Sequence, residues 1–117
     1  WPEGRVAEAV RRLLRIHTDR IFDPQTGHLN LFFDAEWRPQ GRTVSYGHDI
    51  EASWLIDEAA DLLGDPQITA GAGSVSEALA KAAAEGVQPD GTRPVDRTHR
   101  CRPPLVGAGR GCRRIFQ

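Results

Sequence analysis

Residues 48–64, HDIEASWLIDEAADLLG, carry the clearest helical pattern in the chain. Apolar side chains recur there every three or four residues, as on one face of an α-helix. We expect that stripe to be buried, and its members are Ile50, Trp54, Leu55, Ala59, Leu62 and Leu63. Gly64 and Pro66 follow as helix stop signals. We interpret Asp49 as a first-turn acid that complements the helix dipole.

Two further segments are predicted to be helical. Residues 5–21 are amphipathic and carry His17 on their apolar face, as a core or pocket-edge histidine. Glycines at 71 and 73 weaken the next helical segment, so we expect its helix to open only at a capping box formed by Ser74 and Glu77 and to run to Gly86.

The stretch between the first two helices contains a turn and an extended excursion. Residues 23–28, DPQTGH, have the proline and glycine of a turn, and we interpret His28 as structural. Residues 29–41 alternate imperfectly and predict one or two short strands. Three helices and a loop enclose little volume, so the sequence indicates an all-α piece of a larger helical assembly.

The composition argues against a membrane protein and indicates where in the cell the protein is located. The chain has 117 residues, its hydrophobic fraction is 39%, and no apolar run has the length of a membrane span. No secretory leader is visible, so we expect a cytoplasmic protein. The first residue is Trp1, and we therefore expect that the natural start is missing.

The chain changes character after about residue 90. Residues 93–117 hold seven arginines and one acid, net +6, whereas residues 1–92 have a net charge of −7. Both cysteines, Cys101 and Cys112, lie in this segment, and no helical or strand period continues into it. On composition it is a disordered basic tail, a type that can bind nucleic acid.

The start of the clearest helix gathers groups that can move protons. In SYGHDIEASW (45–54), His48 and Glu51 are three residues apart and share a helical face. A carboxylate beside an imidazole increases its basicity and orients it, which suits a general acid or base. Tyr46 and Trp54 offer flat surfaces for sugar rings, and Phe32 in the excursion offers another. Spacing alone favours a surface ion pair, and half of a metal site is a further alternative.

The motifs together resemble a known enzyme family. RLLRIHTDRIFDPQTGHLNLFFDAEWRP and TVSYGHDIEASWLIDEAADLLGD are similar to the N-acylglucosamine 2-epimerase family, most closely to its cellobiose 2-epimerases, over roughly residues 1–88. The resemblance implies part of an (α/α)6 barrel, with residues 1–90 as an incomplete epimerase domain. It implies inversion at C2 of a reducing-end sugar through an enediolate, without a metal or other cofactor.

The resemblance also assigns roles to residues. His48 matches one of two catalytic histidines, and Glu51 matches the carboxylate that tunes it; the second histidine is expected beyond the end of this chain. The expected partner is a disaccharide or monosaccharide, not nucleic acid or a membrane. Because one base is missing, we expect the chain alone to be inactive. A non-catalytic carbohydrate-binding or helical interaction module is the alternative, and sugar binding by the chain alone would distinguish it.

The segment 91–117 departs from the family, whose members continue into a Trp-Trp pair and a Gln-Ala-Glu-Ala helix. Codons compatible with residues 104–117, read one base later, encode RWWAQAEAVVGSF, which resembles that missing segment. We therefore expect a break in the reading frame between residues 88 and 100. Sequencing the coding DNA tests this, because Leu105 and Val106 must both have codons ending in G.

Overall fold

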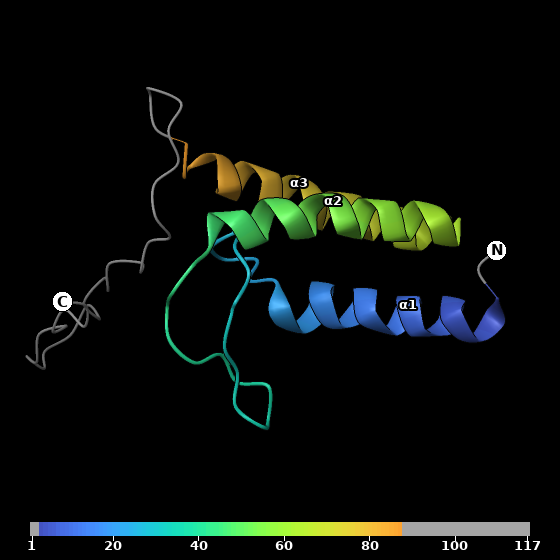
Figure 1. Ribbon diagram of the computed structural model, residues 1–117, viewed down its shortest axis with the longest axis horizontal. Helices are drawn as coiled ribbons and strands as arrows, with labels where there is room; N and C mark the ends of the chain where they lie inside the picture. The colour runs from blue at the N-terminus through green and yellow to red at the C-terminus, as the bar shows by residue number, and fades with distance from the viewer. Residues whose placement is uncertain (1–2, 88–117) are drawn as a thin grey trace, which may run out of the picture.

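The computed structural model describes residues 3–87, in which three α-helices lie side by side (Figure 1). Helix α1 spans Gly4–Ile16, α2 spans Tyr46–Leu63 and α3 spans Pro66–Ala84. Successive helices run in opposite directions, so the end of α1, the start of α2 and the end of α3 meet at one end. This arrangement confirms the all-α prediction of consecutive helical hairpins. The predicted basic tail lies outside the described residues, and the domain boundary near residue 90 stays a prediction.

The first predicted helix continues beyond α1 as a wider turn. His17–Ile21 form the π-helix η1, and the backbone N–H of Phe22 reaches the carbonyl of His17 at 2.8 Å. The His17 ring contributes to this end of the helix, since its Nδ1 lies 2.9 Å from the carbonyl oxygen of Leu13. The ring is half-buried, which agrees with a histidine at the edge of the apolar face.

The excursion between η1 and α2 pairs only locally. Two isolated antiparallel bridges join Phe22 to Leu29 and Phe33 to Pro39. Within residues 3–87 neither bridge extends into a strand, so the excursion is β-like but the one or two predicted strands do not form. An isolated bridge pairs only two residues, and no neighbouring strand extends its hydrogen bonds into a ladder. The loop is held instead by Asp34, whose carboxylate accepts hydrogen bonds from the backbone N–H groups of Glu36 and Arg38.

Helix α3 begins earlier than the sequence predicted. Asp65 caps it by accepting from the N–H groups of Gln67 and Ile68, and Pro66 occupies the first turn. The expected break at Gly71 and Gly73 is wrong, because the helix passes through both glycines. Ser74 is not a cap; its hydroxyl donates to the carbonyl of Ala70 in the preceding turn.

Small and polar side chains form the interface between α2 and α3. The Ser53 hydroxyl lies 2.8 Å from the Ser76 carbonyl oxygen, and the Ser76 hydroxyl lies 2.7 Å from a carboxylate oxygen of Asp57. Both serines are buried. Short side chains let two helices approach closely, and hydrogen bonds satisfy the polar atoms that this approach buries. The adjoining apolar core consists of Leu14, Leu29, Ile56, Ala60, Ala72 and Leu79.

The predicted apolar stripe of α2 is only partly buried in this chain: Ala59 and Leu63 pack against the core, and the other four residues do not. The buried positions of α2 are Asp49, Ser53, Ile56 and Ala60. The large apolar residues of the stripe stand outside that face: Ile50, Trp54, Leu55 and Leu62 are between 45% and 55% exposed. Because apolar side chains occupy a second face of α2, we expect further helices, in addition to α1 and α3, to cover that face. No helix within residues 3–87 has the length and hydropathy to cross a membrane.

Candidate active site at the start of helix α2

Ser45 and His48 form a compact unit at the first turn of α2. Ser45 is the N-cap residue, and its hydroxyl oxygen lies 3.4 Å from the backbone nitrogen of His48, which donates to it. The same oxygen lies 2.7 Å from Nδ1 of the His48 ring. Ser45 is buried, whereas His48 is exposed. The imidazole is thus held at one nitrogen and open to a ligand on its remaining edge.

Glu51 forms no hydrogen bond or ion pair with His48 in this structure. It lies one turn further along α2 and is exposed. Among the described residues no ion pair joins its carboxylate to the His48 ring, whose hydrogen-bond partner is Ser45. The role predicted for Glu51 as the group that tunes His48 stays a prediction.

Asp49 is an acid in the first turn of α2, as predicted, and it is also buried. It is 0% exposed and accepts two hydrogen bonds, one from the backbone N–H of Leu29 at 2.9 Å and one from Nδ1 of His28 at 2.7 Å. His28 is also buried, and its Nε2 lies 3.7 Å from the Glu85 carboxylate. The structure adds a contact that this interpretation did not include, because Asp49 faces the returning excursion and not solvent. This contact ties the turn at 23–28 to the start of α2.

Sequence reasoning missed the Asp49 contact, although one signal was present. Asp49, Ser53, Ile56 and Ala60 recur at intervals of four, three and four residues, so they occupy one helical face. A carboxylate on a face of small and apolar residues is a buried carboxylate with a partner. Its partner could not be read from the pattern, since His28 is 21 residues away along the chain.

Tyr46 packs at the end of the bundle beneath this unit. Its ring meets the His28 ring edge-on, with centroids 5.9 Å apart and planes inclined at 64°. On its other side the backbone of Gly86 comes so close that a Cβ there would lie 2.5 Å from Tyr46 Cγ. Gly86 is therefore required for the end of α3 to lie against Tyr46. A sugar contact through Tyr46 stays a prediction beside this packing role.

The other two predicted substrate-binding residues are strongly exposed. Trp54 is 55% exposed on α2, six residues after His48 and hence about 9 Å further along the helix axis. Phe32 is 60% exposed and stands in the excursion. Within residues 3–87 neither side chain shares a hydrogen bond or ring contact with His48. Both are available to a ligand or to a further helix, and their roles stay predictions.

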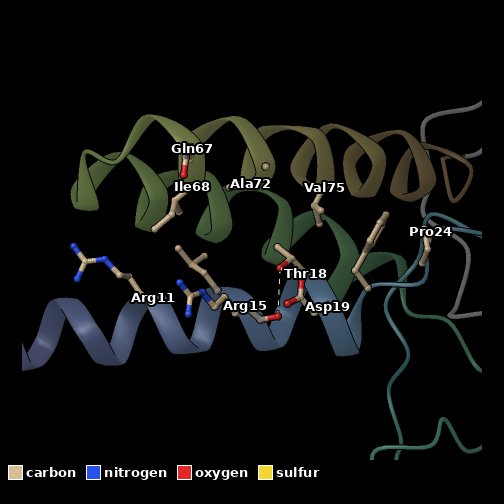
Figure 2. Close-up of a pocket in the computed structure, with 12 residues that line it drawn as sticks. Arg11, Arg15, Thr18, Asp19, Pro24, Gln67, Ile68, Ala72 and Val75 are labelled. Carbon is tan, nitrogen blue, oxygen red and sulfur yellow. Dashed lines mark hydrogen bonds between the residues drawn. The ribbon is translucent and has the colours of Figure 1, made fainter.

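A separate groove lies between α1 and the first half of α3 (Figure 2). Its volume is about 420 Å³, and its apolar wall includes Leu14, Phe22 and Ile68. Arg11 and Arg15 extend from α1 along its edge. None of the predicted site residues lines it. Within the described part of the chain no three His, Cys, Asp or Glu side chains converge as metal ligands would.

Comparison with known proteins identifies the family to which the chain belongs. The chain is 45% identical over 91 residues to cellobiose 2-epimerase from Bacteroides fragilis, a match that covers 78% of this chain and 23% of that relative. The chain belongs to the N-acylglucosamine 2-epimerase family. No protein-family model matches it.

Solved structures of epimerases share the fold of this family member. A sugar epimerase from a ruminal bacterium superposes with a TM-score of 0.76 at 31% identity, covering 82% of this chain and 25% of that one. Cellobiose 2-epimerase from Bacillus thermoamylovorans B4167 superposes with a TM-score of 0.74 at 30% identity, covering 85% and 25%. These epimerases are (α/α)6 barrels. The chain spans about a quarter of their length, so α1, α2 and α3 are consecutive helices of an incomplete barrel.

Proposed function

We propose that the described segment supplies one acid/base group of a carbohydrate 2-epimerase, and that this group is the imidazole of His48. The observation that supports this most directly is an exposed imidazole held at Nδ1 by the N-cap of α2, in a chain that is 45% identical to a cellobiose 2-epimerase. An imidazole fixed at one nitrogen and open at the other suits proton transfer.

The reaction inverts C2 of a reducing-end aldose. Opening of the sugar ring exposes the C1 aldehyde, which acidifies the proton on C2. The unengaged nitrogen of His48 and a second base stand on opposite faces of C2; one removes the proton, leaving an enediolate whose negative charge spreads to O1. The other returns a proton to the opposite face, so glucose becomes mannose with no net gain or loss of atoms. The second base lies outside the described residues.

The remaining side chains are assigned supporting roles within this proposal. Glu51 lies three residues after His48 on α2 and is exposed, and its carboxylate supplies negative charge near the imidazole. The indole of Trp54 is exposed about 9 Å further along the axis of α2, a position that suits the second sugar of a disaccharide such as cellobiose. Phe32 supplies an apolar surface from the excursion.

A chimaeric enzyme tests the proposal, since the reaction needs two bases and this chain supplies one. The matched stretch of the Bacteroides fragilis enzyme is replaced by the corresponding residues of this chain, and conversion of cellobiose to its C2 epimer is measured. We expect the chimaera to be active and His48→Gln to be inactive with an unchanged circular dichroism spectrum. Arg12→Gln, on the exposed surface of α1, is the control and should retain activity. A folded chimaera in which His48→Gln remains fully active would contradict the proposal.

A further inference from the structure

The partner of the His48 ring is a residue to which neither the sequence nor the comparisons assign a role. Ser45 is 4% exposed, and its hydroxyl oxygen lies 2.7 Å from Nδ1 of His48. Backbone contacts surround this residue: Ser45 has extended dihedral angles, its carbonyl accepts from the N–H of Asp49 at 3.0 Å, and its hydroxyl oxygen also accepts from the N–H of His48 at 3.4 Å. The hydroxyl is thus a rigid contact for the imidazole and not a mobile surface group.

Occupation of Nδ1 determines which ring nitrogen can exchange protons with a ligand. Since Nδ1 faces the buried hydroxyl of Ser45, the nitrogen left for substrate is Nε2. A base needs a lone pair on the nitrogen that faces its substrate, so the neutral ring must carry its hydrogen on Nδ1. That hydrogen then points at the Ser45 oxygen, at a distance suited to a strong hydrogen bond.

We propose that Ser45 is a positioning residue for the reaction, because its hydroxyl accepts from Nδ1–H of His48 and thereby selects the tautomer whose Nε2 is the base. This inference rests on the proposed function of His48. A hydroxyl oxygen has two lone pairs, which serve the ring Nδ1–H and the backbone N–H of His48 together. When Nε2 takes up a proton, Nδ1–H still donates to the same oxygen, so the ring keeps its orientation through both halves of the reaction.

A serine in this place has a different effect from a carboxylate. A carboxylate partner would orient the ring and also stabilise the imidazolium by its charge. The neutral hydroxyl orients the ring without adding that charge. Within the described residues the hydrogen-bond partner of the ring is Ser45 and not Glu51, so we assign orientation of the ring to Ser45.

The test uses the chimaeric enzyme and two readouts, one of them independent of activity. Histidine ring nitrogens are labelled with ¹⁵N, and the His48 signals are identified by their absence in His48→Gln. Spectra are recorded at a pH at which the ring is neutral, and we expect its hydrogen on Nδ1 in the parent. Ser45→Gly keeps a residue that is tolerated at an N-cap but removes the hydroxyl; it should lose the single tautomer and lower kcat about 100-fold, as a displaced catalytic group does, with little change in KM.

Two matched variants separate positioning from loss of a helix cap. Ser45→Thr restores a hydroxyl at the same place and should restore the tautomer and most of kcat. Asp65→Ala removes the equivalent cap of α3 and should change neither. A parent ring with hydrogen on Nε2, or Ser45→Gly with unchanged kcat and tautomer, would overturn the proposal. Full activity of His48→Gln would instead overturn the proposed function, while the tautomer would still report on Ser45.

Discussion

The buried contact between Asp49 and His28 is the most consequential feature for stability that the structure adds. The Asp49 side chain accepts two hydrogen bonds in a site that is almost completely closed to water. Asp49→Asn preserves the shape and keeps an oxygen for the N–H of Leu29, but it replaces the carboxylate that meets His28. Since hydrogen bonds to a charged group contribute about 1.5–3 kcal/mol, we expect a loss of that size in the free energy of unfolding.

Asp49→Ala removes both hydrogen bonds and should cost more. It leaves the Leu29 N–H and the His28 ring without this acceptor in a buried site, for which the expected loss is about 3–5 kcal/mol. Urea unfolding of the chimaeric enzyme, followed by circular dichroism, measures both variants. The midpoint should fall in the order parent, Asn, Ala, with little change in the slope of the transition.

A surface acid provides the control for this series. Glu77 on α3 is exposed and pairs with Lys81 one turn away at 2.6 Å, so Glu77→Gln should have only a small effect. If Asp49→Asn were no more destabilising than Glu77→Gln, the assignment of Asp49 as the tie between the turn and α2 would be refuted.

Three further predictions follow from packing and charge. In the chimaera Gly86→Ala should lower the free energy of unfolding by about 1–3 kcal/mol, because the added methyl group would overlap the Tyr46 ring. Gly71→Ala has open space at its Cβ position and should stabilise α3 by about 0.5–1 kcal/mol. Thermal unfolding distinguishes the two variants. Leu62→Ala should cost about 2–5 kcal/mol in the chimaera, where we expect neighbouring helices to cover this side chain, which is 55% exposed here; a loss below about 1 kcal/mol would contradict this. The hydrogen bond and charge of Lys81 lower the pKa of Glu77, so Lys81→Met should raise that pKa in an NMR titration, and an unchanged pKa would contradict this prediction. The pair stabilises the fold at pH values above the pKa of Glu77 in the unfolded chain. This stabilisation is lost as the pH falls through the pKa of Glu77 in the folded chain.

Helix α2 shows both the reach and the limit of sequence reasoning. Its end was predicted correctly, because Gly64 adopts the left-handed conformation that stops a helix, with φ of 64°. Its buried face was predicted only in part, because hydrophobic periodicity selects large side chains and the contact with α3 uses Ser53, Ile56 and Ala60. The large side chains occupy a second face, which a fragment of a barrel leaves open.

The site shows the same division between local and distant information. The prediction of a helix start near His48 is confirmed, because Ser45 is an N-cap that local sequence can reveal. The ring contact of that same serine was missed, since the i,i+3 spacing drew attention to Glu51. The contact of Asp49 with His28 depends on how the excursion returns to α2, and no local pattern encodes that path.

Exchange at C2 tests the central claim most directly. The chimaeric enzyme is incubated in heavy water separately with cellobiose and with its C2 epimer, and deuterium at C2 is followed by NMR and mass spectrometry. If His48 is one of two bases on opposite faces, the parent should incorporate deuterium from both sugars. His48→Gln should lose incorporation from at least one sugar and interconvert neither. Incorporation from both sugars at the parental rate in folded His48→Gln would contradict the assignment of His48 as a base.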